Sequence, residues 1–470
     1  MKDERNFTKA RALGFSGLLL WILIAALAFH LAYASANACF FVVLYLFALL
    51  RLAQADKWRT AFYSGLAVGV LIAAGHLDFF WRLFSAGAMA LWLVYAVWLG
   101  LFVAIARLCW LAFGPKRAWL LVPFVWIGLE YSRSELYYLR FSWLNPAYAF
   151  AEVPRLLPFH RAGIYGVDFL LVTIASIAAV CWKKSRVRSL AALVSGAAVI
   201  CICALVGGEK ASPVHARVRI SGVQMEFPTE NEVVSALNAL LSQYPDTELV
   251  VLSEYTFTEP IPTKVKDWCR QNNRYLIVGG EDPAAHDNFY DTAFVIGPSG
   301  DIVFRQAKSV PIQFFKDGLP AAKQELWDSP WGRFGLCICY DLSYRRVTDR
   351  LVKLGAQALI VPTMDVLDWG KRQHELHARI APLRAAEYGI PIFRVASSGI
   401  SQSVDATGRT VSMAPCPGQD ATLSDTVEIR GAGRLPADRW LAPLGTGLTA
   451  VLIVWLLVRQ RFVKQPDSAL

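Results

Sequence analysis

Residues 189–224 read SLAALVSGAAVICICALVGGEKASPVHARVRISGVQ, and the character of the chain changes within this stretch. The first part, 189–207, contains no charged residue and has the length of a membrane-spanning helix, which needs roughly 20 apolar residues. The last part, 219–224, has the length and composition of a buried strand. The sequence therefore predicts a polytopic α-helical membrane domain before this stretch and an α/β domain after it.

The composition of the whole chain reflects these two parts. The 470 residues are 55% hydrophobic but only 18% charged, whereas typical soluble domains carry about 25% charged residues. Mean hydropathy is +0.38. These values argue against an ordinary cytosolic enzyme and exclude a disordered chain. With only nine cysteines and 32 glycines, the chain is neither a disulfide scaffold nor collagen-like.

Eight apolar runs are expected to span the membrane. As buried helices of a soluble protein they would need almost no charged face, so we favour membrane spans. The second and fifth runs are short, and re-entrant or tilted elements remain an alternative for them. The first run follows basic residues but lacks a clear cleavage site, so we interpret it as a retained helix. The runs are 13–31, 38–51, 61–77, 86–106, 118–131, 163–182, 189–207 and 440–458.

Basic residues gather in alternate loops, which predicts a cytoplasmic N-terminus. Seven spans then place the α/β domain outside the cytoplasm, and the eighth returns the tail. The domains are thus 1–208, 209–437 and 438–470. Loop 132–162 carries both signs of charge and is the weakest point of this assignment. Much of the net charge of +10 is explained as a topology signal, so no nucleic-acid partner is expected. The basic residues are Lys2, Arg5, Lys9, Arg11, Arg51, Lys57, Arg59, Arg107, Lys116, Arg117, Lys183, Lys184, Arg186, Arg188, Arg459, Arg461 and Lys464.

Short β-rich runs alternate with helical stretches in the α/β domain, an order typical of stacked sheets covered by helices. The expected helices are 230–243, 261–272, 344–354 and 371–387. The expected strands are 219–224, 249–253, 275–279, 292–296, 334–339, 358–361, 392–395 and 402–404.

The cysteines and histidines do not suggest a metal site. Cys337 and Cys339 alternate along an expected strand and point to opposite faces, so one is core while the other faces a site. His374 and His377 lack a spaced cysteine pair and are expected to shape or cap a helix. The outer domain has four cysteines, Cys269, Cys337, Cys339 and Cys416, which an oxidising compartment would permit to form disulfides. Neither a metal nor a cofactor is expected.

Three β-rich segments each carry a reactive side chain toward the end of the run: Glu254 in 250–255, Lys308 in 303–311 and Cys339 in 335–341. A cysteine nucleophile needs a base to take its proton, and a cation stabilises both the thiolate and a developing oxyanion. Taken singly, an exposed glutamate, an exposed lysine and a buried cysteine are each the more ordinary interpretation.

The order and spacing of these three residues resemble the nitrilase, or carbon–nitrogen hydrolase, superfamily. The motifs 288–293 and 384–391 add to the resemblance. With eight spans around the domain, and the loop motifs at 129–133, 141–146, 163–167 and 394–401, the chain resembles the apolipoprotein N-acyltransferase family.

This resemblance implies a four-layer αββα sandwich beside the membrane helices. It also implies a two-step acyl transfer from a phospholipid to the amine of a diacylglyceryl-cysteine lipoprotein in the bacterial plasma membrane, with the catalytic domain on the periplasmic or outer side. Cys339 would form a thioester, Glu254 would act as general base and Lys308 would stabilise the oxyanion. Tyr340 and Asp341 follow the nucleophile as supporting residues. Trp143 and Tyr148 would line a lateral entry for acyl chains, or else belong to an interfacial aromatic belt.

The site departs from the family pattern after Lys308. The family has a Val-Pro-Phe-Gly-Glu run whose glutamate supports the site, whereas residues 310–317 read VPIQFFKD. Asp317 is the candidate substitute. Two alternatives therefore stay open: a divergent amidase or acyltransferase with another acceptor, and a non-catalytic paralogue acting in binding or assembly.

Overall fold

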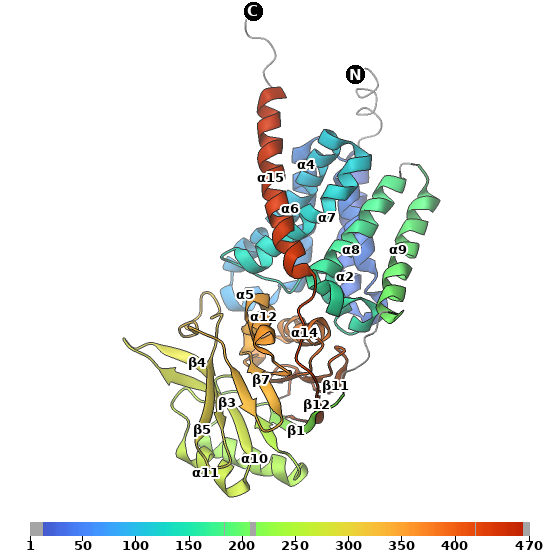
Figure 1. Cartoon of the computed structure of the whole chain (residues 1–470). Coiled ribbons are helices and arrows are strands. Elements are labelled where there is room, and N and C mark those ends of the chain that lie inside the picture. The colour runs from blue at the N-terminus through green and yellow to red at the C-terminus, as the bar shows by residue number, and fades with distance from the viewer. Residues whose placement is uncertain (1–12, 183, 207–212, 419, 464–470) are drawn as a thin grey trace, which may run out of the picture.

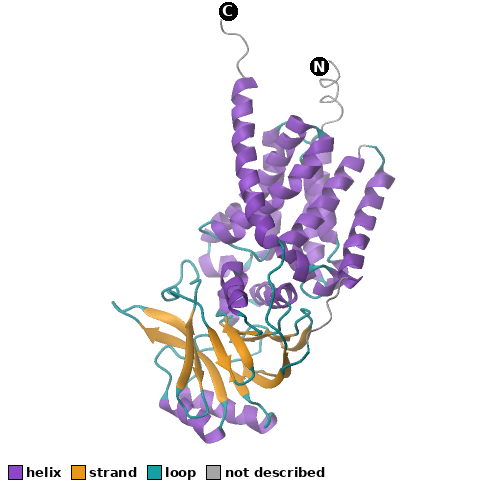
Figure 2. Ribbon diagram, in the orientation of Figure 1, coloured by secondary structure: helices purple, strands orange, loops and turns teal. Residues whose placement is uncertain are grey.

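The computed structural model describes residues 13–182, 184–206, 213–418 and 420–463. A bundle of long helices occupies one end of the molecule and two β-sheets occupy the other (Figures 1 and 2). The N-terminal stretch forms most of the bundle, and the last helix returns to it. The bundle consists of α2 (Phe15–Ala34), α3 (Phe41–Leu52), α4 (Trp58–His76), α5 (Phe79–Phe84), α6 (Gly87–Phe113), α7 (Pro115–Tyr131), α8 (Phe159–Trp182), α9 (Arg186–Val206) and α15 (Asp438–Val463).

Each of the eight expected spans falls on a helix of this bundle. Within the described residues, five helices are long and apolar enough to cross a membrane: α2, α6, α8, α9 and α15. The chain is therefore built as a membrane protein, and the count of eight passes stays a prediction. Of the two short runs, α3 is a 12-residue apolar helix. The other lies in α7, which has 17 residues.

The loops of the bundle gather at its two ends. At one end, the guanidinium groups of Arg51 and Arg186 both lie over the ring of Trp182, 5.2 and 5.5 Å from its centroid. At the other end, Trp143 in the loop after α7 donates a 3.1 Å hydrogen bond to Ser343 of the α/β domain. The mixed-charge loop 132–162 thus faces the sheets. The basic residues Lys2, Arg5, Lys9, Arg11, Lys183 and Lys464 lie outside the described residues.

The α/β domain contains two six-stranded sheets with matching topology. The first has the order β12-β1-β2-β3-β4-β5 and the second β11-β10-β9-β8-β7-β6. Each has three parallel strands at its centre, β1–β2–β3 and β9–β8–β7, with antiparallel strands outside them. The strands of the first sheet are β1 (Ala216–Val223), β2 (Leu249–Val251), β3 (Tyr275–Pro283), β4 (Phe289–Ile296), β5 (Ile302–Ala307) and β12 (Thr422–Ile429). Those of the second are β6 (Leu326–Ser329), β7 (Gly332–Leu336), β8 (Ala358–Thr363), β9 (Ile392–Ala396), β10 (Ser401–Val404) and β11 (Thr410–Ala414).

Side chains alternate between the two faces of each strand, so each sheet packs on both faces and the domain has four layers. Leu249 and Val251 of β2 belong to the core that the two sheets share. Val250, between them, belongs to a separate core under α10 (Glu230–Gln243) and α11 (Thr263–Asn272). Successive strand residues point to opposite faces, so β2 is apolar on both. The second sheet is covered by α12 (Arg345–Leu354), α13 (Lys371–Ala378) and α14 (Ile380–Tyr388), of which α12 and α14 lie between the sheets and the bundle (Figure 1). The expected αββα sandwich is the fold of this domain.

Two expected elements are wrong in their extent. The strand expected at 334–339 ends at Leu336, because Cys339 has a φ of 49° and begins a tight helical turn. The helix expected at 371–387 is broken at Arg379 into α13 and α14. Pro382 has no N–H to donate to the carbonyl of Ala378, and its ring would clash with that carbonyl in a continuous helix.

All nine cysteines, which lie within the described residues, are free thiols, so the disulfides permitted by the composition are not formed. The proposed division at 437 and 438 falls where α15 begins, whereas that at 208 and 209 lies outside the described residues. Strands β6, β11 and β12 were not expected from the sequence.

Candidate active site

The three reactive side chains predicted from the sequence meet in one buried site. Glu254 follows β2, Lys308 follows β5 and Cys339 follows β7. Their exposed fractions are only 2%, 1% and 2%. In α/β sheets, ligand sites form beyond the carboxyl ends of parallel strands, and β2 and β7 are the parallel strands that place Glu254 and Cys339.

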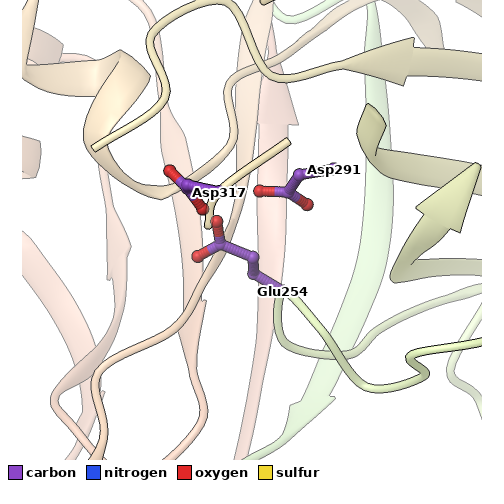
Figure 3. A group of neighbouring side chains, drawn as sticks. All are labelled: Glu254, Asp291 and Asp317. Carbon is purple, nitrogen blue, oxygen red and sulfur yellow. The ribbon is translucent and has the colours of Figure 1, made fainter. Parts of the chain in front are cut away.

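Lys308 is the centre of a cluster of three carboxylates. Its Nζ lies 2.6 Å from Oε1 of Glu254, 2.7 Å from Oδ2 of Asp317 and 3.4 Å from Oδ2 of Asp291. Figure 3 shows the three acidic side chains converging on one point from separate segments. The ligand atoms of the three carboxylates lie within 4.8 Å of one another, a spacing that suits a cation. The ammonium group of Lys308 is the cation at this point, so the chain itself supplies a positive charge to the cluster.

The electrostatics of the cluster follow from burial and this central cation. Burial alone would lower the pKa of Lys308, but Glu254, Asp317 and Asp291 hold it well above its usual value, so it stays charged. Burial, the largest single cause, raises the pKa of Glu254, but the charge of Lys308 and the hydrogen bonds to the carboxylate together outweigh it, so the pKa lies below its usual value. Glu254 is therefore an ionised carboxylate at neutral pH and can accept a proton.

Cys339 is held as a thiol beside this carboxylate. Burial, then the charge of Glu254, raises the pKa of its thiol well above the usual range. The other oxygen of Glu254, Oε2, accepts a 2.7 Å hydrogen bond from the backbone N–H of Met364. The Sγ of Cys339 lies 3.7 Å from the carbonyl oxygen of Met364. A base is therefore required to activate the sulfur, and Glu254 is next to it. Cys337 is fully buried and does not line the adjacent cavity.

The supporting residues named from the sequence are brought to the same place. Asp341 accepts hydrogen bonds from the backbone N–H groups of Ser309 (3.0 Å) and Val310 (2.7 Å), and so fixes the loop after Lys308. Burial raises the pKa of Asp341 to about 6. Tyr340 lines the cavity beside Cys339.

Asp317 supplies the carboxylate that the altered loop sequence appeared to lack. Besides its contact with Lys308, its Oδ2 accepts a 2.6 Å hydrogen bond from the N–H of Ile312. Its Oδ1 accepts a 3.0 Å hydrogen bond from the hydroxyl of Tyr255. The loop therefore presents an aspartate to Lys308 even though its residue order departs from the family pattern.

An apolar cavity of about 970 Å³, including space open to solvent, adjoins the thiol. It lies between the α/β domain and the bundle, with walls from α5, α6, loop 139–143, loop 312–315 and α13. Trp143 lines it and stacks on His377, with ring centroids 4.8 Å apart. Tyr148 is buried but is not among the residues that line this cavity.

Several residues of the site were not assigned a role from the sequence. Asp291 was noted only as part of a motif, and Arg140 only as a loop charge. His377 was expected to shape a helix; it lines the cavity and its Nδ1 lies 2.8 Å from Oδ1 of Asp365. Asp365 also pairs with Arg394, at 2.5 Å. The positions of two of these residues could have marked them in the sequence. Asp291 lies within a β-run and Asp365 lies just after one, and carboxylates are unusual at such buried positions.

Comparison with protein families finds two matches along the chain. The family described as apolipoprotein N-acyltransferase N-terminal domain matches residues 16–177. The family described as carbon–nitrogen hydrolase matches residues 232–424. The first match covers most of the bundle and the second covers the α/β domain that carries the site.

Curated relatives match this chain over most of its length. The chain is 24% identical over 464 residues to the apolipoprotein N-acyltransferase of Shewanella oneidensis, covering 86% of this chain and 87% of the relative. It is 24% identical over 387 residues to that of Geobacter metallireducens, covering 70% and 73%. Among solved structures, a carbon–nitrogen hydrolase from Helicobacter pylori is 17% identical with a TM-score of 0.40, covering 53% of this chain and 99% of that one. Saccharomyces cerevisiae Nit3, of the nitrilase superfamily, is 20% identical with a TM-score of 0.39, covering 47% and 93%.

Proposed function

Because the chain belongs to the apolipoprotein N-acyltransferase family, we propose that it moves an acyl chain from a membrane phospholipid to the N-terminal amine of a diacylglyceryl-cysteine lipoprotein. The observation that carries this proposal is the position of the Cys339 thiol: it lies beside Glu254 and Lys308 and also at the wall of an apolar cavity. A thiol, a base and a cation perform acyl transfer, and the cavity suits a lipid chain.

In the first step, the sulfur of Cys339 attacks the carbonyl carbon of the phospholipid ester while Glu254 takes the thiol proton. The pKa of the thiol is raised and that of Glu254 is lowered. Proton transfer therefore accompanies the attack, since a free thiolate beside Glu254 would be unfavourable. Lys308 stabilises the negative charge that develops on the carbonyl oxygen. The C–O bond then breaks, Glu254 returns the proton to the leaving oxygen, and a lysophospholipid departs from the thioester.

In the second step, the uncharged amine of the acceptor attacks the thioester carbonyl. The amine loses a proton to Glu254 and the C–S bond breaks. Glu254 then protonates the sulfur, which restores Cys339 as a thiol. No water is consumed in either step, and the burial of all three groups limits hydrolysis of the thioester.

The site should accordingly lie at a membrane surface. We place the α/β domain outside the cytoplasm, on the strength of the basic loops gathered at the opposite end of the bundle. Both proposed substrates are lipids, and we propose that they enter the cavity between sheets and bundle from the bilayer.

The nucleophile is tested by intact-mass analysis after incubation with phospholipid. We expect an acyl adduct, sensitive to hydroxylamine, on the wild type and on Cys337→Ser, and none on Cys339→Ala. Cys337→Ser is the matched control because this thiol is equally buried but lies outside the cavity.

An adduct lost in Cys337→Ser and kept in Cys339→Ala would show that the nucleophile is misassigned. Rescue of cells depleted of their own apolipoprotein N-acyltransferase tests the acceptor. A thioester without rescue would favour another acceptor or an amidase, and no thioester with any phospholipid would favour the non-catalytic alternative.

A further inference from the structure

Arg140 lies at the wall of the cavity that contains the thiol of Cys339. It belongs to the loop between η2 (Ser132–Leu136) and η3 (Pro146–Phe150). Its backbone carbonyl accepts hydrogen bonds from the hydroxyls of Tyr340 (3.1 Å) and Tyr344 (3.3 Å). Its guanidinium carbon lies 5.2 Å from the centroid of the Tyr344 ring. The two hydrogen bonds therefore tie the loop to the segment that carries the nucleophile. The contact with the Tyr344 ring positions the Arg140 side chain.

The charge of Arg140 is not compensated by the chain. No carboxylate of the described residues lies within 4.0 Å of its side-chain nitrogens, and its Nε is buried without a hydrogen-bond partner. The two most deeply buried arginines differ: Arg384 pairs with Glu387 at 2.6 Å, and Arg394 with Asp365 at 2.5 Å. A partly buried guanidinium without a counter-ion is a site for an anion, because a planar fork of N–H donors suits phosphate and carboxylate groups.

The other residues of the cavity wall restrict the chemical class of the ligand that carries this anion. Among the described residues that line the cavity there is no aspartate or glutamate, and most are aromatic or aliphatic. The second arginine of the wall, Arg133, donates to the carbonyl of Phe141 and, at 2.6 Å, to Oδ1 of Asn145, so both of its terminal nitrogens already have a partner in the chain. The occupant must combine an anionic group with a long apolar part.

We propose that Arg140 binds the phosphate of the phospholipid that donates the acyl chain. This inference rests on the proposed function and concerns only its first step. With the phosphate at Arg140 and the acyl chain along the apolar wall, the ester between them lies toward Cys339. A diacylglyceryl-cysteine carries no phosphate, so Arg140 serves donor binding and has no role in transfer to the amine.

The test compares two acyl donors, one with a phosphate and one without. Thioester formation is measured in detergent micelles with a phosphatidyl lipid and with a p-nitrophenyl ester of the same fatty acid. For Arg140→Gln we expect the KM for the phospholipid to rise about tenfold or more, since charge-assisted hydrogen bonds to phosphate are lost. The KM and kcat for the p-nitrophenyl ester should be unchanged. Arg140→Lys keeps the charge but loses the planar fork of N–H donors, so its KM for the phospholipid should lie between those of the wild type and Arg140→Gln.

The matched control is Arg155→Gln, which removes an exposed arginine that pairs with Asp405 at 3.5 Å, away from the cavity. It should leave both donors unaffected. Equal losses on both donors in Arg140→Gln, or no loss on the phospholipid, would overturn the assignment of Arg140 while the thioester chemistry stands. Failure of the wild type to form a thioester with either donor would instead overturn the proposed function, and the role of Arg140 with it.

Discussion

At the residue scale, the site depends on how three buried carboxyl groups share one ammonium group. Three ionised carboxylates beside Lys308 would leave two uncompensated negative charges in a buried site, which is costly. Asp291 is the group least well paired: it lies 3.4 Å from Nζ, and its oxygens have no hydrogen-bond partner. Burial, then the charge of Glu254, raises the pKa of Asp291 well above its usual value. Burial raises the pKa of Asp317 too, but this carboxylate lies 2.7 Å from Nζ and accepts two further hydrogen bonds. We infer that Asp291 keeps its proton and that Glu254 and Asp317 are ionised.

Substitution tests this distribution of charge. Asp291→Asn mimics a protonated carboxyl group, so the rate of thioester formation should stay within about threefold of wild type. Asp317→Asn removes an ionised partner of Lys308 and weakens a charge-assisted contact, so the rate should fall about tenfold or more. The measurement is single-turnover formation of the acyl adduct by mass spectrometry. Equal and large losses in both variants would mean that Asp291 is also ionised in the resting enzyme.

At the element scale, abrupt backbone changes after regular elements aim the functional groups. Tyr255 and Cys339, each just after a strand, have φ values of 49°. Side-chain-bearing residues rarely adopt such values, and they persist where surrounding structure enforces them. Helix α8 is likewise kinked at Gly163, with φ 74° and ψ 174°. Beyond the kink, the N–H groups of Ile164 and Tyr165 donate to Glu387 (3.2 Å) and Asp438 (3.0 Å). Carboxylates at a helix start are stabilising.

Gly163 is therefore expected to tolerate no side chain. In Gly163→Ala, the residue would keep a positive φ and its Cβ would collide with the carboxylate of Asp438. We expect the protein to lose about 2 kcal/mol or more of stability. The measurement is thermal unfolding in detergent, followed by circular dichroism.

Gly447→Ala in α15 is the control, because a Cβ there meets no atom within 4 Å. Alanine favours a helix over glycine by about 1 kcal/mol, so this variant should be neutral or slightly more stable. Similar unfolding temperatures for the two variants would contradict the role given to the kink.

At the scale of the whole molecule, a network of buried charges fixes the α/β domain to the bundle. Arg439, at the start of α15, contacts Asp349 at 2.5 Å, Glu387 at 2.7 Å and Asp438 at 2.5 Å. Glu135, in the loop after α7, accepts a 3.0 Å hydrogen bond from the N–H of Arg345. Removing one partner of such a network leaves unpaired buried charges, so these contacts specify one arrangement of the two parts. That arrangement creates the cavity, whose walls come from both.

The proposed orientation is tested by labelling intact spheroplasts with a membrane-impermeant maleimide. Gln271→Cys, exposed on α11 of the α/β domain, should be labelled in intact cells. Lys57→Cys, exposed just before α4, should be labelled only after lysis. The reverse pattern would invert the topology, and labelling of both positions in intact cells would mean that the chain does not alternate as proposed.

The sequence predicted the layered fold because buried strands and membrane spans appear as apolar runs. Glu254, Lys308 and Cys339 each follow such a run, but only the resemblance of their order and spacing to the nitrilase superfamily singled them out. The prediction from sequence failed at two element boundaries. The break at Arg379 follows from Pro382, a local signal that the helical pattern of 371–387 obscured. The end of β7 at Leu336 precedes the left-handed residue Cys339, which a strand pattern alone does not reveal.

By itself, the sequence determined that an apolar helical half precedes an α/β half. Composition and periodicity suffice for that, because burial in lipid or in a sheet selects residue types directly. The candidate residues Glu254, Lys308 and Cys339 were instead singled out by an order and spacing that resemble the nitrilase superfamily. Only the tertiary structure decided that Asp291 and Asp317 share Lys308 with Glu254, and that Arg140 lies unpaired beside Cys339. Charges distant in sequence affect one another only once folding brings them within a few ångströms in a site from which water is excluded.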